Sequence, residues 1–516
     1  MDGLASWTEI GRTGGRDPLA MLSAVEYAYQ TQLSGISTIT ERLRYYAFHC
    51  WWISHYADTS PTKSAAEYGD HARRFELLYA LASLCVPEDH TGVSDEIGIS
   101  GAKETKKILR KGEDKIDFRY LTARDTPGEK RYIEPPMGDF ANSYAPQMRE
   151  IGLLHKPPSH GLFVPTARGL ELATRFEESL GHASRVFREA AKSGNVDRCI
   201  LAALSHCRPG AIPQEGAEAE MLCDLLMARL EPDPETLPES RRPAARMARD
   251  TAVARRDTLL WILDTAKDNP ETPVSQKMLR WHWLETPVSS DHPRAQTHAS
   301  WQHYQCGDTA RVACEAILAH AVREISRAPR DLSSLLNGLV EPLEGTGSLG
   351  AWLAMIEDRQ ANDPLRIIQG RALDGSEDLD ILIAPIARIH AAWGKREPEL
   401  ATAYPEDRSG KQTVRTLLRW IKEHADRPSC DAMRDFLRDF IVMRHLAVAA
   451  GKFRANGAYT YLFEFHDREL HWRQTLSANP SGPRLKIALR FLEDLDLLEE
   501  GYITPRGKAL LARETP

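Results

Sequence analysis

Apolar residues recur at the spacing of an α-helix through most of this chain, and this periodicity is what most constrains its fold. In "TVRTLLRWIKEHA", Val414, Leu417, Leu418 and Ile421 fall at positions i, i+3, i+4 and i+7, on one face of a helix. Residues 181–430 continue this pattern, and no repeat of fixed period is visible, so we expect a mainly α protein rather than a regular solenoid. Polar, proline-containing breaks interrupt the pattern at 207–216, 231–243 and 285–298.

The length of the chain indicates several domains. A chain of 516 residues exceeds what one hydrophobic core usually supports. Strand-like alternation is scarce, and its clearest example is "GAYTYLFEFHDRELHWRQ", which we interpret as a hairpin that turns at "HDREL". The predicted division is a helical region with a basic stretch at 1–131, a small unit at 132–180, a central helical domain at 181–430 and a C-terminal domain at 431–516.

Two short stretches share an unusual order of elements. In "FLEDLDLLEEGYITPRGKALL" (491–511), leucines spaced for one helix face precede a short strand and the turn residues Pro505 and Gly507. In "MREIGLLHKPPSHGLFVPTARGLELA" (148–173), a short helix ends at Gly152, a strand follows, and "PTARGLEL" matches "TPRGKALL" in type. Helix, strand, turn and then a further helix or strand is the order expected at the end of a winged helix.

Both stretches resemble the winged helix-turn-helix superfamily over a short span. Its members often carry "LxxLGLL", a gap, and then a strand that ends in Thr and Gly. Asp496 stands in the second copy where the family usually has Gly. Together with the helical periodicity and the chain length, the resemblance predicts a mainly α, multidomain helical protein with two winged-helix-like units, each with a small β wing.

A winged helix binds DNA by laying one helix in the major groove, while the wing and nearby cations contact phosphates. In the C-terminal copy this helix would include "SGPRLKIALRFL", whose Arg484, Lys486 and Arg490 are candidate DNA contacts. In the first copy, "NSYAPQMRE" offers Asn142, Ser143, Gln147 and Arg149. Acidic residues follow the C-terminal helix, and winged helices in large helical proteins also mediate protein contacts. Binding of double-stranded DNA and binding of a protein partner therefore both remain as alternatives for these units.

A basic stretch at 100–131 carries ten Lys or Arg against six Asp or Glu. Its Lys106, Lys107 and Arg110 are candidates to contact a phosphate backbone. Because acidic residues interleave with the cations, the alternative of a solvated, partly mobile loop is favoured over a phosphate-binding surface.

Two Arg-His spacings match the loose Arg-x(4–6)-His pattern of HEPN ribonucleases, helical proteins in which Arg and His act on the RNA phosphate and 2′-hydroxyl. Arg438 and His445 form one pair, and Asp439 supplies the polar residue that often follows the arginine. Two turns apart on a helix, Arg438 and His445 would share a face. The other pair, Arg44 and His49, lies in "RLRYYAFHCWW", whose aromatic residues instead indicate a buried helix with Arg44 hydrogen-bonded inside. An HEPN-type ribonuclease is the alternative function.

Few other residues point to chemistry. In "GRALDGSEDLDILIA", Asp378 and Asp380 resemble the paired metal ligands of nucleotidyltransferases, but the Gly-Ser turn is misplaced and the stretch fits a helix with an acidic first turn. Histidines between His282 and Cys306 are spaced too irregularly for a zinc site. No Walker, GxSxG or HExxH motif occurs. We therefore expect no metal, no cofactor and no catalytic residue outside the ribonuclease alternative.

The balance of charge excludes a globally basic nucleic-acid binder. Net charge is −7 and the isoelectric point is near 6.2, so any nucleic-acid surface is local. Eight scattered cysteines without a CxxC pair indicate neither a disulfide scaffold nor a zinc ribbon. The N-terminus lacks a signal-peptide core and no apolar run reaches the length of a membrane span, so we expect a cytoplasmic protein that does not enter a membrane.

Two further segments, "GRDPLAMLSAVEYAYQTQLSGISTITERLRYYAFHCWWISHYA" and "ASWQHYQCGDTARVACEAILAHAVREI", resemble uncharacterised bacterial proteins encoded near mobile elements and antiviral defence operons. This resemblance assigns no catalytic residue. It implies an accessory role beside an enzyme from a neighbouring gene. We therefore expect a non-catalytic, nucleic-acid- or partner-binding component of a bacterial defence complex, and a purely structural scaffold is the remaining alternative.

Overall fold

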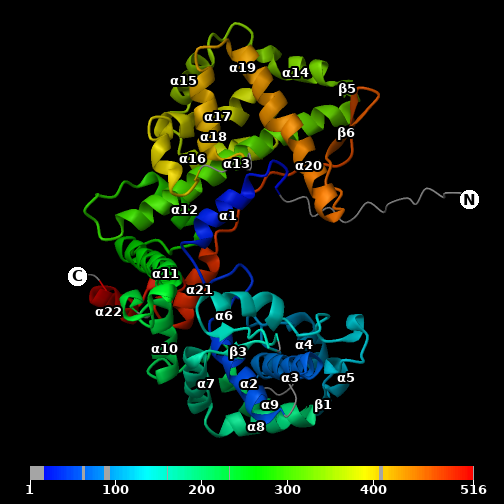
Figure 1. The fold of residues 1–516 in the computed structure, drawn as a ribbon, viewed down its shortest axis with the longest axis vertical. Helices are drawn as coiled ribbons and strands as arrows, with labels where there is room; N and C mark the ends of the chain where they lie inside the picture. Colours follow the sequence, from blue (N-terminus) through cyan, green and yellow to red (C-terminus); the bar gives the residue numbers. More distant parts are fainter. Residues whose placement is uncertain are drawn as a thin grey trace, which may run out of the picture. The chain divides into compact units, whose positions relative to one another are not determined.

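The computed structural model describes residues 17–60, 64–86, 93–159, 161–231, 233–405 and 411–514. The protein is mainly helical, and its strands are few and short (Figure 1). This confirms the predicted fold class at the level of a mainly α, multidomain protein. Across these ranges no helix combines the length and the apolar character that crossing a membrane requires.

The helices group into two compact units, each assembled from segments distant in the sequence. Unit 1 is built from the described residues of 1–29, 280–290 and 298–482. Unit 2 is built from those of 30–279, 291–297 and 483–516. The predicted C-terminal segment therefore contributes to both units, and the division into four domains stays a prediction.

Unit 2 holds most of the short strands. Its helices are α2 (Tyr45–Thr59), α3 (Ala65–Leu84), α4 (Ala102–Arg110), α5 (Arg119–Thr122), α6 (Ala145–Glu150), α7 (Ala167–Leu180), α8 (His182–Ser193), α9 (Arg198–Ala203), α10 (Ala217–Leu226), α11 (Arg242–Asp268), α21 (Leu485–Asp494) and α22 (Pro505–Glu514). Its strands pair antiparallel as β1 (Lys115–Asp117) with β4 (Asn195–Asp197), β2 (Leu154–His155) with β3 (Val164–Pro165), and β8 (Leu498–Glu499) with β9 (Tyr502–Ile503). Short turns of helix are η1 (Gly128–Lys130), η2 (Phe140–Tyr144), η3 (Ser205–Cys207), η4 (Pro234–Thr236) and η5 (Glu239–Arg241).

The core of unit 2 forms around α2, which packs along α7 and α3 (Figure 1). Trp52 on α2 is fully buried, and Phe48 stacks on Tyr79 of α3 with ring centroids 4.0 Å apart. Burying each such aromatic side chain stabilises the fold by roughly 2–3 kcal/mol. Arg44 lies inside this core and pairs with the equally buried Glu218, 2.8 Å away. The prediction of a buried aromatic helix with Arg44 hydrogen-bonded inside is confirmed.

The two stretches that resemble each other in sequence fold alike. Both consist of a helix, a two-stranded hairpin and a second helix: motif 1 is α6, β2, β3 and α7, and motif 2 is α21, β8, β9 and α22. The sequence leaves the last element open between a helix and a strand, and it is a helix in both. The local motif is thus repeated, whereas membership of the winged-helix superfamily stays a prediction.

A threonine holds the hairpin of each motif to the end of its first helix. The Oγ1 of Thr166 donates to the carbonyl oxygen of Gly152 at 2.7 Å, and that of Thr504 donates to the backbone carbonyl oxygen of Asp496 at 2.6 Å. Gly152 and Asp496 both have left-handed backbones, with φ of +78° and +56°. Glycine adopts this conformation without penalty and aspartate tolerates it, so Asp496 fills the glycine position without changing the turn.

Unit 1 contains the longest helix of the described chain. Its helices are α1 (Leu22–Gln30), α14 (Leu332–Val340), α15 (Leu349–Arg359), α16 (Leu365–Leu373), α17 (Leu379–Trp393), α18 (Val414–His424), α19 (Ser429–Phe436) and α20 (Met443–Asn456), together with most of α12 (Gln276–Glu285) and α13 (Ala295–Arg327). Short turns of helix are η6 (Glu341–Leu343), η7 (Glu397–Ala401) and the π-helical η8 (Leu437–Val442). Strands β5 (Arg330–Asp331), β7 (Glu469–Trp472) and β6 (Phe463–His466) form one sheet in that order.

A buried ionic network on α13 anchors the extended segment that follows β7. Asp308 is fully buried and accepts hydrogen bonds from Arg280 at 2.6 Å and from Arg311 at 2.9 Å. Arg311 also pairs with Glu315, and the Ser481 backbone N–H donates to Asp308. Because unpaired buried charges are costly, this network fixes one arrangement of helix and segment.

The hairpin predicted at 457–474 is confirmed at β6 and β7. These strands pair antiparallel around Asp467 and Arg468, whose φ values are +50° and +69°. Two positive φ values define the type I′ turn that suits a two-residue hairpin.

Candidate functional site

The three cations predicted in the C-terminal reading helix make contacts within unit 2. Arg484 precedes α21 and donates to the carbonyl oxygen of Leu33 at 3.3 Å. Lys486 and Arg490 both face Glu41, with N–O distances of 3.9 and 3.3 Å. The Lys486 side chain is 63% exposed and that of Arg490 only 20%. One carboxylate therefore partly neutralises both cations, and Lys486 is the most accessible of the three.

The wing of motif 2 carries negative charge. Glu499 and Glu500 are exposed at its tip, beside Tyr502, whose side chain is 41% exposed. A wing that contacts DNA meets phosphates, and carboxylates oppose that approach. The arrangement disfavours docking of motif 2 on DNA through this hairpin.

In motif 1, α6 offers one exposed cation. Arg149 lines a pocket of about 360 Å³ beside the start of α7. Gln147 is half-buried, and its Oε1 lacks a hydrogen-bond partner among the described residues. In the same pocket Arg168 pairs with Glu231 at 2.9 Å, and burial lowers the pKa of Arg255 to about 10. Arg149 is thus the predicted contact of motif 1 that solvent reaches.

The basic stretch forms a helix where the favoured alternative was a loop. Residues 102–110 are helical, so the prediction of a solvated loop is wrong there, since an apolar face packs on α3. Lys106 pairs with Asp95 at 3.0 Å, and Lys107 with Glu104 at 2.7 Å. The outward face carries four exposed cations: Lys103, Lys107, Arg110 and, just past the helix end, Lys111. Their spacing of four, seven and eight residues places them on one side of α4.

Arg438 and His445 do not form an accessible pair. Arg438 is exposed and pairs with Asp439 at 2.8 Å. His445 is 1% exposed; its Nδ1 bonds the carbonyl oxygen of Pro18 at 3.3 Å, and its Nε2 accepts the backbone N–H of Leu462 at 3.0 Å. Burial lowers the pKa of His445 to about 4. Both ring nitrogens are therefore occupied inside unit 1, and the other Arg-His pair lies in the core around α2.

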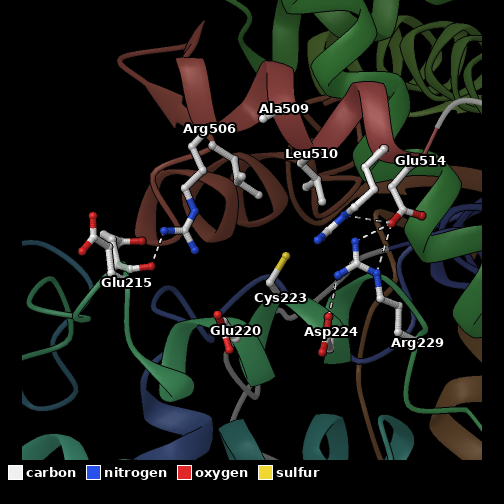
Figure 2. A pocket seen from close by; sticks show the side chains of 12 residues that line it. Glu215, Glu220, Cys223, Asp224, Arg229, Arg506, Ala509, Leu510 and Glu514 are labelled. Atoms are coloured by element: carbon white, nitrogen blue, oxygen red, sulfur yellow. Dashed lines mark hydrogen bonds and ion pairs between the residues drawn. The ribbon is translucent and has the colours of Figure 1, made fainter.

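A pocket of about 930 Å³ opens between α10 and α22 in unit 2 (Figure 2). Arg506, Leu510 and Arg513 come from one face of α22, while Glu220 and Cys223 come from α10. Figure 2 shows the Arg506 guanidinium and the Cys223 sulfur pointing into the space between these helices. The repeated motif thus supplies one wall of this pocket through its last helix.

The charges of the pocket are arranged on opposing walls. Arg229 closes one end, where it pairs with Asp224 at 2.6 Å and with Glu514. The α22 wall carries its arginines opposite the exposed Glu220 of α10. Burial raises the pKa of the Cys223 thiol, so the residue is a poor nucleophile despite its central place. Covalent chemistry through Cys223 is therefore disfavoured.

The sequence alone did not identify the residues that pair with the charged side chains of these sites. Glu41 lies 449 positions from Arg490, and Arg229 lies 285 positions from Glu514. No local pattern links such partners, because only the tertiary fold brings them together. The sole hint in the sequence is that acidic residues slightly outnumber basic ones.

The remaining predicted alternatives are structural. Asp378 caps the start of α17, where its Oδ1 accepts the backbone N–H of Asp380 at 2.8 Å, as the helical interpretation of that stretch requires. Within the described ranges, no group of three or more His, Cys, Asp or Glu side chains is placed to hold a metal ion. Comparison of the chain with protein-family models, with curated proteins and with solved structures found no match.

Proposed function

We propose that the protein is a non-catalytic nucleic-acid-binding component that contacts the phosphate backbone of double-stranded DNA. The single observation that carries the proposal is the row of exposed cations on α4. Lys103, Arg110 and Lys111 make no ion pair with any described residue, and the pair between Lys107 and Glu104 is exposed on both sides. Exposed pairs of this kind contribute about 0–1 kcal/mol, so all four cations are available to phosphates.

The proposal assigns backbone contact, rather than base reading, to this surface. Lysine is a flexible point charge that suits phosphate, whereas base reading needs side chains held in a groove. The reading helix α21 supports base recognition less well, because Glu41 faces both Lys486 and Arg490. The two motifs then serve mainly to build unit 2. A place for the protein in a bacterial antiviral defence complex rests on the resemblance in sequence.

Fluorescence anisotropy of a labelled, mixed-sequence DNA duplex across a salt series tests this function. The proposal expects binding at low salt that weakens steeply as salt rises, because each phosphate contact releases counterions. It further expects little dependence on the duplex sequence. Absence of binding at low salt would contradict the proposal.

The pocket between α10 and α22 favours a second candidate function, the docking of a protein partner. Its centre is apolar at Leu510 and Ala509, and its walls carry opposite charges at Arg506 and Glu220. This arrangement suits an amphipathic segment with acidic residues along one side and basic residues along the other. The test is co-purification from the source cells with wild type and with Arg506→Glu. A partner that both proteins retain equally would contradict docking at this pocket.

A further inference from the structure

The first part of α11 is exposed to an unusual degree. Between Arg242 and Asp250 no residue is buried, and Met247 is 70% exposed. The first buried residue of the helix is Ala252. A stretch of more than two turns that fully buries no residue gains little hydrophobic stabilisation from the rest of unit 2. Its persistence as a helix fits its alanine content, and its surface is free to meet a partner.

This exposed stretch is strongly basic on one side. Residues 241–250 contain four arginines and one acidic residue, Asp250. Arg242, Arg246 and Arg249 follow at intervals of four and three residues, so they form one row, which we call the arginine face. The row spans roughly 10 Å along the helix, comparable to the reach of three successive phosphates of one DNA strand.

An acidic segment lies along the arginine face. We call residues 233–239, which include η4 and the start of η5, the acidic strap, and both η4 and η5 contact α11. Glu235 pairs with Arg246 at 2.5 Å and with Arg242 at 3.5 Å, and Asp233 pairs with Arg249 at 3.4 Å. The strap thus places carboxylates where phosphates would bind.

These ion pairs are open to water and easily exchanged. The side chains of Arg246, Glu235 and Asp233 are each 58% exposed, and that of Arg249 is 47% exposed. Exposed pairs contribute little and are screened by salt. Arginine forms stronger, two-pronged hydrogen bonds with phosphate, so a polyanion competes well for these guanidinium groups.

We propose that the arginine face of α11 is a second surface for a phosphodiester backbone, and that the acidic strap occupies it until nucleic acid binds. This inference rests on the proposed function, to which it adds a contact surface and a built-in competitor. If the strap competes with phosphate, removing its charge strengthens nucleic-acid binding. If the strap only stabilises the helix, removing its charge weakens binding.

The experiment compares four variants with wild type in the anisotropy assay, on a DNA duplex and on a single-stranded RNA of equal length. The strap variant is Asp233→Asn with Glu235→Gln, and the arginine-face variant replaces Arg242, Arg246 and Arg249 by Ala. A matched control replaces Arg175 and Arg185 by Ala, since these are also exposed helical arginines paired with carboxylates. The fourth variant removes the four exposed cations of α4, and circular dichroism checks that every protein keeps its helix content.

We expect the strap variant to bind about threefold to tenfold more tightly than wild type, because its three weak ion pairs no longer compete. We expect the arginine-face variant to bind at least about tenfold more weakly. The slope of log K against log salt concentration (the salt slope) should be smaller in magnitude by about 2 to 3. The control stays at the wild-type affinity, and the tighter of the two ligands identifies the nucleic acid.

Three outcomes would overturn the inference. If only the α4 variant loses affinity, the arginine face does not contact nucleic acid, although the proposed function stands. If wild type binds neither DNA nor RNA at low salt, both the inference and the proposed function fail. A strap variant that binds more weakly than wild type would show that the strap supports the helix rather than competes with phosphate.

Discussion

Gly169 lies so close to the carbonyl oxygen of Leu153 that no side chain fits between them. Gly507 has the same relationship to Leu497 in motif 2. A Cβ atom at either glycine would stand closer than 3.0 Å to the backbone oxygen, which cannot move aside as a flexible side chain would. This contact brings the last helix of each motif against its hairpin, and it explains why both copies carry glycine there.

Substitution of either glycine by alanine therefore destabilises unit 2. We expect Gly169→Ala and Gly507→Ala each to lower the free energy of unfolding by about 1–3 kcal/mol, the usual cost of overpacking. Gly451→Ala in α20 is the control, because a Cβ there meets nothing within 4 Å and alanine favours a helix. Urea denaturation measures all three. Equal stability of Gly507→Ala and wild type would contradict the account.

The buried pair of Arg44 and Glu218 gives a second prediction. Their side chains are 1% and 0% exposed, so Arg44→Ala leaves an uncompensated carboxylate in the core. We expect a loss of about 3–5 kcal/mol from this change, and a smaller loss when Glu218 is replaced by Leu in the Arg44→Met background. A double-mutant cycle of Arg44→Met, Glu218→Leu and the double variant, followed by chemical denaturation, measures the coupling free energy between the two side chains. Strictly additive changes in the free energy of unfolding would argue against the pair.

The buried imidazole of His445 makes unit 1 sensitive to acid. Its pKa is lowered to about 4 by burial, from an ordinary value near 6.5, and protonation would set Nε2–H against the N–H of Leu462. The folded state therefore binds fewer protons than the unfolded state, and stability falls as pH drops from about 6.5 towards 4. The loss amounts to about 3 kcal/mol at most for this group.

Denaturation curves at several pH values, for wild type and His445→Gln, measure this loss. The variant should show a flatter pH dependence in this window, whatever its absolute stability. Wild-type and variant profiles of the same slope would contradict the role of His445. The same variant tests the ribonuclease alternative, which requires metal-independent RNA cleavage that disappears with the imidazole.

Thiol labelling should separate one cysteine from the rest. Cys199 is exposed and Cys430 is half-exposed, whereas the other six are buried. Burial raises the pKa of Cys207 and Cys314 to about 12, which leaves almost no thiolate at neutral pH. Ellman's reagent on the native protein should therefore react in one fast phase that Cys199→Ser removes. A fast phase that survives in a variant with both Cys199→Ser and Cys430→Ser would contradict the burial of the other six cysteines.

The features that were predictable from the sequence are those that depend on neighbours along the chain. The helical period places Val414, Leu417, Leu418 and Ile421 on one face of α18, and all four are buried. The likeness of the two short stretches, down to Thr166 and its counterpart, emerges because each hydrogen bond closes within one motif, over 14 and 8 residues. Helical periodicity and hydrogen bonds within one motif can be recognised without knowledge of the tertiary contacts.

The charge environment of the site was not predictable in this way. The cations of α21 look like DNA contacts until Glu41, far away in the sequence, is placed beside them. The exposed part of α11 was also obscured, since 231–243 reads as a polar break and the arginine-rich stretch after it has no apolar stripe. Both depend on which surfaces the fold leaves open, and local pattern carries no information about that.

The measurement that tests the central claim most directly compares the salt dependence of duplex DNA binding by two variants. One replaces Lys103, Lys107, Arg110 and Lys111 by Ala, and the other replaces Arg484, Lys486 and Arg490 by Ala. The account predicts that the first variant loses about 3 to 4 from the salt slope, and the second no more than about 1, since only Lys486 is well exposed. A second variant that loses as much as the first, or more, would contradict it and return the DNA contact to α21.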